Sequence, residues 1–205
     1  NGGVVNLKNA KFNATGSFDH GIIVKNGWFD NDGTINIQNG TILDCGGNTG
    51  NDAACIVRGT VNMYGGTITS TSSKKSAIGI QAGEIKIVGG KIQNFDWGIW
   101  LNTTNVSATI GNVTFENNDC DIVMDSGKKF TIQDDFQGTA SVKVNSFPCT
   151  ITTPGTSPEM CKRITYDDGF HSISYDTTEK CLYVSDHLHS WSYSTSANKI
   201  IATCT

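Results

Sequence analysis

The segment GTVNMYGGTI, from Gly59 to Ile68, decides the fold of this chain because it is repeated with drift. Related copies are GTINIQNGTI from Gly33, GEIKIVGGKI from Gly83 and a degenerate ATIGNVTF from Ala108. A unit that recurs every 23 to 30 residues is typical of repeat architectures. The repeat therefore indicates the fold class before any single residue indicates the chemistry.

Apolar residues keep a constant spacing of five within the copies. The pairs are Leu7 and Phe12, Ile37 and Ile42, Met63 and Ile68, Ile87 and Ile92, and Ile110 and Phe115. A further apolar position follows each pair, at Ile22, Ile56, Ile80, Ile99 and Ile122. The alternation of Ile35, Asn36 and Ile37 predicts a short strand with one face in water. Each repeat is therefore expected to hold three short strands.

Short strands separated by Gly or Asn, at this period, are typical of an all-β fold, the parallel β-helix, whose coils stack about 4.8 Å apart. We expect a right-handed β-helix of about five to six coils over residues 1–145. Phe130, Ile132 and Phe136 would form a last irregular coil, and Ala140 to Val144 a closing strand. A β-sandwich is the alternative, but its strands do not repeat one template.

The charge pattern disfavours a nucleic-acid partner. The 205 residues carry a net charge of -4, and the only arginines are Arg58 and Arg163, so no basic stripe follows a phosphate backbone. The sequence has no signal peptide, transmembrane run or lipidation signal, and we expect no membrane insertion. Because the chain opens in mid-repeat at Asn1 and stops abruptly at Thr205, we expect a piece of a longer protein, with neighbouring domains as partners.

The seven cysteines indicate an oxidising, extracellular compartment. They lack the Cys-x-x-Cys spacing of a zinc site, so disulfides are the expected use. Cys45 and Cys55 flank a long loop and form one candidate pair. Cys149 with Cys161, or Cys161 with Cys181, forms another, and the sequence leaves both pairings open.

The sequence changes character at Ser146. The stretch YDDGFHSISYDTTEKCLYVSD alternates apolar and polar residues around the turn from Asp176 to Glu179, which predicts a β-hairpin. We therefore expect residues 146–186 to form a small disulfide-containing β appendage. Residues 187–205 would begin a further, truncated module.

The final stretch HLHSWSYSTSANKIIATCT, from His187 to Thr205, resembles the H-x-W-x-Y…ATC modules of large surface proteins of Gram-positive gut bacteria. The GGTI coils resemble the parallel β-helix regions of the same adhesin-like proteins. The resemblance implies an exported protein that is secreted or lies at the bacterial cell surface. It names no ligand.

The fold also resembles that of pectate lyases and polygalacturonases, so a polysaccharide lyase or glycoside hydrolase is an alternative function. Hydrolysis needs acidic residues at set places. Asp134 and Asp135 are adjacent but lie past the last clear coil, and the trio Asp19 to Gly21 is typical of a turn entering a strand. Arg58, the one arginine of the coils, has no acidic neighbour. We therefore predict no catalytic residue.

Metal binding is not expected either. Asp119, Asp121 and Asp125 alternate with residues of a strand pattern, which disfavours a calcium loop. His187 and His189 are too few ligands for a metal. We expect no cofactor.

The repeat register assigns outward columns to each sheet. The first is Asn6, Asn36, Asn62, Lys86 and Thr109, and the second is Lys11, Thr41, Thr67, Lys91 and Thr114; both are polar. The third is largely apolar: Ile23, Val57, Gln81, Trp100 and Val123. Such a row is either covered by the chain itself or kept for a partner.

Trp100, with Trp97 close by, could stack on a sugar or anchor a protein contact. The predicted ligand-binding residues are Trp100, Trp97, Gln81, Ile23, Val57 and Val123. These features favour a non-enzymatic extracellular binding or adhesion module. Its expected partner is a host glycan or a glycoprotein, mucin-like or a secreted immune protein. A passive spacer between other domains is the third alternative.

Overall fold

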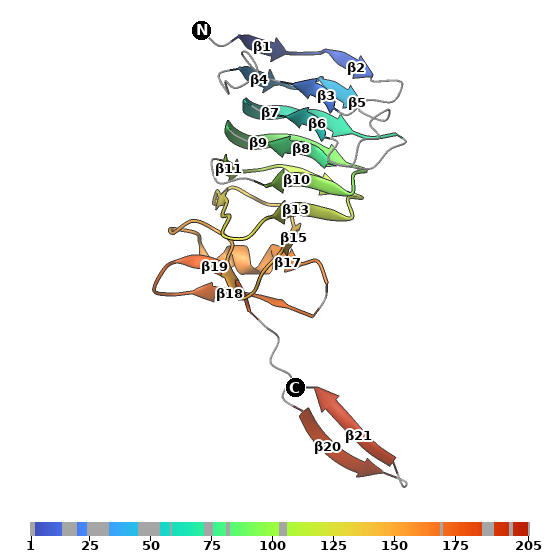
Figure 1. The fold of residues 1–205 in the computed structure, drawn as a ribbon, viewed down its shortest axis with the longest axis vertical. Coiled ribbons are helices and arrows are strands. Elements are labelled where there is room, and N and C mark those ends of the chain that lie inside the picture. The colour runs from blue at the N-terminus through green and yellow to red at the C-terminus, as the bar shows by residue number, and fades with distance from the viewer. Residues whose placement is uncertain are drawn as a thin grey trace.

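The computed structural model describes residues 3–13, 20–23, 33–44, 54–57, 59–71, 76–80, 83–102, 106–168, 170–185, 191–196 and 199–204. Their structure is nearly all β, with one short 3₁₀ helix, η1 (Pro158–Lys162). Strands of successive turns lie one above another (Figure 1). The predicted fold class is confirmed: the chain is a parallel β-solenoid of about five turns with a small β appendage.

The first sheet contains the strands of the repeated GTI units. Its main path runs through β1 (Val4–Leu7), β4 (Thr34–Ile37), β7 (Thr60–Thr69), β9 (Gly83–Gln93), β11 (Val106–Ile110) and β14 (Thr131–Ile132). Three short strands continue the turns beside it, β2 (Lys11–Asn13), β5 (Ile42–Asp44) and β12 (Thr114–Glu116). All these pairings are parallel, as expected for stacked coils.

The second sheet is also parallel and extends beyond the expected boundary of the solenoid. It runs through β3 (His20–Ile23), β6 (Ala54–Val57), β8 (Ser76–Ile80), β10 (Trp97–Leu101), β13 (Cys120–Met124), β15 (Ala140–Val144) and β17 (Ile164–Tyr166). Strand β17 pairs with β15, so a boundary at residue 145 does not separate the sheets. Part of the expected appendage, residues 146–186, therefore completes the solenoid.

The predicted hairpin in the appendage is confirmed. β18 (Ser172–Asp176) pairs antiparallel with β19 (Cys181–Ser185), and β16 (Cys149–Thr150) pairs with the other edge of β19. Backbone amides of Thr178 and Glu179 donate to Oδ1 of Asp176 at 2.8 and 2.9 Å, which closes the turn. Beyond them, β20 (Trp191–Ser196) and β21 (Lys199–Cys204) form a second hairpin.

Like residues stack on like in the core, as the spacing predicts. Ile37, Met63, Ile87 and Ile110 are consecutive partners in the ladder and at most 1% exposed. Burial of each such side chain contributes roughly 1.5 to 3 kcal/mol. Because each coil is covered by its neighbours, the stability of the solenoid is collective.

The first outward column is confirmed and forms an asparagine ladder. Nδ2 of Asn36 donates to Oδ1 of Asn6 at 2.7 Å, and Nδ2 of Asn62 donates to Oδ1 of Asn36 at 2.9 Å. The register continues to Lys86 and Thr109. This polar face therefore couples adjacent coils through side-chain hydrogen bonds.

The second column differs from prediction in one turn. Ile42, expected in the core, is 41% exposed, and Leu43 replaces it at 0%. Thr41, expected outside, is 1% exposed and donates to the Leu7 carbonyl at 3.0 Å. The corner at Gly40 holds one residue more than that of the next turn, and a one-residue shift exchanges the two faces. The other members are confirmed, at Lys11, Thr67, Lys91 and Thr114.

The glycines of the repeat make the corner between its two strand segments. Gly40, Gly66 and Gly90 have φ of 77°, 81° and 96°, in a backbone region that residues other than glycine rarely adopt. The same glycine recurs because each coil must turn at the same place. The GGTI motif is therefore a corner followed by a strand.

Candidate binding surface on the second sheet

Strand β10 carries two tryptophans whose rings contact each other outside the core. Ile99 and Leu101 are 0% and 1% exposed, so Trp100 between them points outward. Strict alternation would place Trp97 on the opposite side of the strand. The two ring centroids nevertheless lie 5.3 Å apart, edge to face at 61°. The strand is therefore bent between them.

The bend lies at Gly98. A Cβ atom at this position would lie 3.3 Å from two ring carbons of Phe115, so Gly98 faces the core side of the strand. The neighbouring strand β8 has the same break, since its consecutive residues Ala77 and Ile78 both belong to the core. With two successive residues facing inward, the tryptophans before and after them share the outer face.

The predicted place of Gln81 beside Trp100 is wrong. The partner of Trp100 on β8 is Gly79, because Ile99 pairs with Ile78 rather than with Ile80. A shift of two residues keeps the same face, so the alternation pattern does not distinguish the two registers. Gln81 itself lies outside the described residues. Glycine thus leaves no side chain beside Trp100 on the β8 side.

The remaining predicted members of the apolar column contribute less than expected. Val123 is the partner of Trp100 on β13, but it is 4% exposed although it does not belong to the main core. It is therefore covered and cannot contact a ligand. Ile23 and Val57 are partners in the register as predicted, but their side chains lie outside the described part of the chain. The surface is thus carried by the two tryptophans, which are partly exposed.

A network of hydrogen bonds joins β13 and β15 beside the strand that carries the tryptophans. Oδ2 of Asp121 accepts from the backbone amide of Ser141 at 2.9 Å, and Ser141 Oγ bonds the Asp121 amide at 2.9 Å. Nδ2 of Asn118 donates to Oδ1 of Asp121 at 3.0 Å. Burial raises the pKa of the Asp121 carboxyl, against these hydrogen bonds, which lower it. The network links β13 to β15 next to β10, the strand that carries Trp97 and Trp100.

An ion pair lies on the same face. Lys143 follows Val123 in the register, two strand spacings or about 10 Å from Trp100. Its Nζ lies 3.6 Å from Oδ2 of Asp167, and the lysine side chain is 53% exposed. Aromatic rings and charged hydrogen-bonding groups on one flat face are the groups that hold a saccharide, which has apolar C–H faces and hydroxyl edges.

In the described part of the chain, the acidic residues considered above do not form a metal site. Asp134 and Asp135 are exposed. Asp125 accepts from Nδ2 of Asn145 at 2.7 Å, and Asp119 is exposed. Within the described ranges, no group of three or more His, Cys, Asp or Glu could hold a metal ion. Asp19, Arg58, His187 and His189 lie outside those ranges.

The predicted bridges between Cys149, Cys161 and Cys181 are not formed, and all three cysteines are free. Cys149 lies on β16, which pairs with one edge of β19. Cys161 Sγ lies 3.6 Å from the carbonyl oxygen of Ile173 on β18, which pairs with the other edge of β19. Strand β19 therefore lies between them. Cys181 is three residues from the partner of Ile173, about 10 Å along the strand and on its other face. Cys45 and the side chain of Cys55 lie outside the described residues.

Cys120 is expected to resist alkylation in the folded protein. It is 2% exposed, and burial first, then the negative charge of Asp167, raise the pKa of its thiol to about 12. The thiol is therefore almost entirely protonated at pH 8, and the thiolate is the reactive form. Mass spectrometry after iodoacetamide treatment should find Cys120 labelled only in urea. Labelling of native Cys120 at the unfolded rate would contradict its burial.

An aromatic cluster in the appendage had no signal in the sequence. The rings of Phe147 and His171 stack with centroids 4.0 Å apart, and Tyr166 meets them edge-on at 5.3 and 5.2 Å. Nδ1 of His171 lies 2.6 Å from Oδ2 of Asp168. Burial acts to raise the pKa of Asp168, but hydrogen bonds from His171 and the Phe170 amide hold it below its ordinary value. Phe147 follows β15, whereas Tyr166 ends β17 and His171 precedes β18, and only the fold brings them together.

Comparisons with known proteins add no relative. No family model, curated protein or solved structure matches this chain. No helix among the described residues is long and apolar enough to cross a membrane.

Proposed function

We propose that this chain is a non-enzymatic binding module of an exported bacterial surface protein of adhesin type, and that it binds a glycan of a host glycoprotein. The observation that carries the proposal is the contact between Trp97 and Trp100 on the outer face of the solenoid. Tryptophans are enriched at interfaces, and contiguous exposed apolar groups such as this pair mark interaction sites.

The solenoid supports this role because it is a rigid platform. Its inner residues are almost fully buried, and its other outward columns are polar except at Ile42. A pair of indoles in edge-to-face contact on such a platform is already ordered before a ligand arrives. Little side-chain entropy is then lost on binding, which favours affinity.

A glycan array that carries neutral, sialylated and sulfated glycans, together with purified mucin, tests the proposal. We expect the intact protein to retain at least one class of glycan and Trp97→Ala to lose it. Release of unsaturated or reducing sugars from polygalacturonate, with or without calcium, would support a polysaccharide lyase or hydrolase instead. No binding to the array or to mucin, together with no turnover of polygalacturonate, would support a passive spacer.

A further inference from the structure

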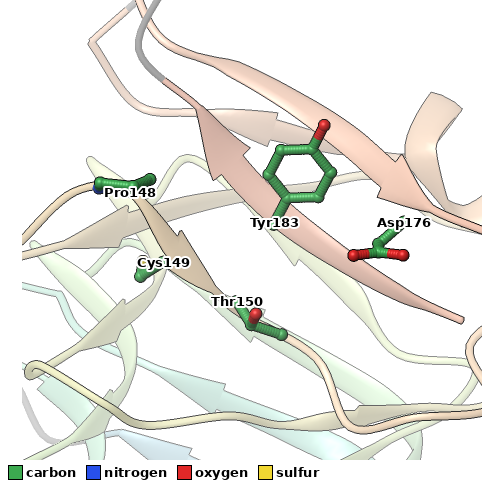
Figure 2. A pocket seen from close by; sticks show the side chains of 5 residues that line it. All are labelled: Pro148, Cys149, Thr150, Asp176 and Tyr183. Atoms are coloured by element: carbon green, nitrogen blue, oxygen red, sulfur yellow. The ribbon is translucent and has the colours of Figure 1, made fainter. Parts of the chain in front are cut away.

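A shallow pocket in the appendage lies away from the tryptophan pair. Its volume is about 260 Å³, and it is lined by Pro148, Cys149, Thr150, Asp176 and Tyr183. Figure 2 shows the ring of Tyr183 above Thr150 and beside the carboxylate of Asp176. The pocket is built on the three-stranded antiparallel sheet, whereas the tryptophans lie on the second sheet of the solenoid.

The strand register places the polar groups of this pocket on one face. Thr150 and Tyr183 are direct partners across β16 and β19. Leu182 and Val184, on either side of Tyr183, are 0% exposed in the core, so Tyr183 points to the opposite, outer face. Asp176 ends β18 at the hairpin turn. An aromatic ring, a hydroxyl and a carboxylate therefore converge from three strands.

These groups retain hydrogen-bonding capacity. Oδ1 of Asp176 accepts from the turn amides, and this leaves Oδ2 for a ligand. Among the residues that the structure describes, neither the Thr150 nor the Tyr183 hydroxyl has a hydrogen-bond partner. All three side chains are partly exposed. A ligand can therefore form these bonds without breaking others.

We propose that this pocket binds one neutral hexopyranose residue of a glycan. The apolar face of the sugar ring stacks on Tyr183 or Pro148, and its hydroxyls donate to Asp176 Oδ2 and bond the Thr150 hydroxyl. Two hydroxyls and a carboxylate suit a ligand with several hydroxyl groups, whereas an ammonium group would use the carboxylate alone. No cationic residue lines the pocket, so Asp176 repels sugars that carry a carboxylate or sulfate.

This inference does not depend on the proposed function of the tryptophan pair. The two sites lie on different sheets and share no residue. Substitutions in one site therefore leave the other unchanged. If glycans bind in the pocket but not at the tryptophan pair, or at the pair but not in the pocket, one proposal fails while the other stands.

The test is a ¹H–¹⁵N NMR titration with methyl β-galactoside, methyl β-glucoside and methyl α-mannoside, and with N-acetylneuraminic acid and methylammonium as charged comparisons. We expect at least one neutral glycoside to shift the amides of Thr150 and Tyr183 at millimolar concentration. Tyr183→Ala should weaken its binding about tenfold, since loss of an aromatic stack costs about that factor. Asp176→Asn keeps a side-chain oxygen that can accept from the turn amides. It should weaken binding of the neutral sugar several-fold and remove the repulsion of N-acetylneuraminic acid.

The controls keep the proposal falsifiable. Tyr183→Phe retains the ring and should bind within a few-fold of the unmodified protein, even if the alanine variant does not fold. Trp100→Ala should leave the shifts of the Thr150 and Tyr183 amides unchanged, whatever it does to shifts at the tryptophan pair. The proposal is overturned if no neutral glycoside shifts these amides at tens of millimolar. It is also overturned if N-acetylneuraminic acid or methylammonium shifts them more than every neutral sugar does.

Discussion

Gly90→Ala is expected to lower the free energy of unfolding by about 3 kcal/mol or more, because it combines backbone strain with overlap between coils. Gly90 has φ of 96°, which an alanine adopts only at a cost of about 1 to 2 kcal/mol. Its Cβ would also lie 2.8 Å from the carbonyl oxygen of Gly66 and 2.9 Å from the carbonyl carbon of Gly65. Both are backbone atoms of the preceding coil and cannot rotate away. Urea unfolding followed by circular dichroism measures the loss.

Gly127→Ala is the matched control. Gly127 has φ of 77°, but a Cβ there meets no heavy atom within 4 Å. Its substitution should cost only the backbone term, about 1 kcal/mol. Equal losses for Gly90→Ala and Gly127→Ala would contradict the account of the repeat as a column of crowded corners.

Trp100→Ala is expected to weaken glycan binding roughly thirtyfold without unfolding the protein. A tryptophan at the centre of a binding surface commonly contributes about 2 kcal/mol, and each 1.4 kcal/mol is about a tenfold change in Kd. The ring lies outside the main hydrophobic core, so its loss leaves no cavity there. Isothermal titration with the glycan found on the array measures the change in Kd.

Tyr64→Ala is the matched control for a non-specific loss of aromatic surface. Tyr64 lies on β7 of the first sheet and is 48% exposed. Its removal should leave glycan affinity unchanged. The same Kd for Trp100→Ala and Tyr64→Ala would exclude the tryptophan pair as the site.

The fold could be predicted because the solenoid repeats one template. The ladder from Ile37 through Met63 to Ile110 follows directly from the constant spacing. The predicted register was wrong at two places, and the constant spacing of apolar residues cannot reveal either error. The extra residue before Leu43 exchanged the faces, and the two-residue shift at Ile78 preserved them while changing the partner of Trp100.

The candidate site was predicted only in part. Alternation placed Trp100 outside, but the contact with Trp97 depends on the bend at Gly98, which no alternating pattern contains. The burial of Val123 depends on what covers the sheet, and this is a property of the folded chain. Tyr183 and Thr150 are far apart in sequence, so the pocket they line was not foreseen.

The NMR signals of the indole N–H groups show whether Trp97 and Trp100 form the binding surface. The chain has four tryptophans, Trp28, Trp97, Trp100 and Trp191, so a ¹H–¹⁵N spectrum resolves one indole signal for each, which single substitutions can assign. On titration with the glycan or mucin-derived oligosaccharide retained on the array, we expect the signals of Trp97 and Trp100 to shift together and saturate. Saturable binding that leaves both of these signals in place would contradict the claim that this pair is the binding surface.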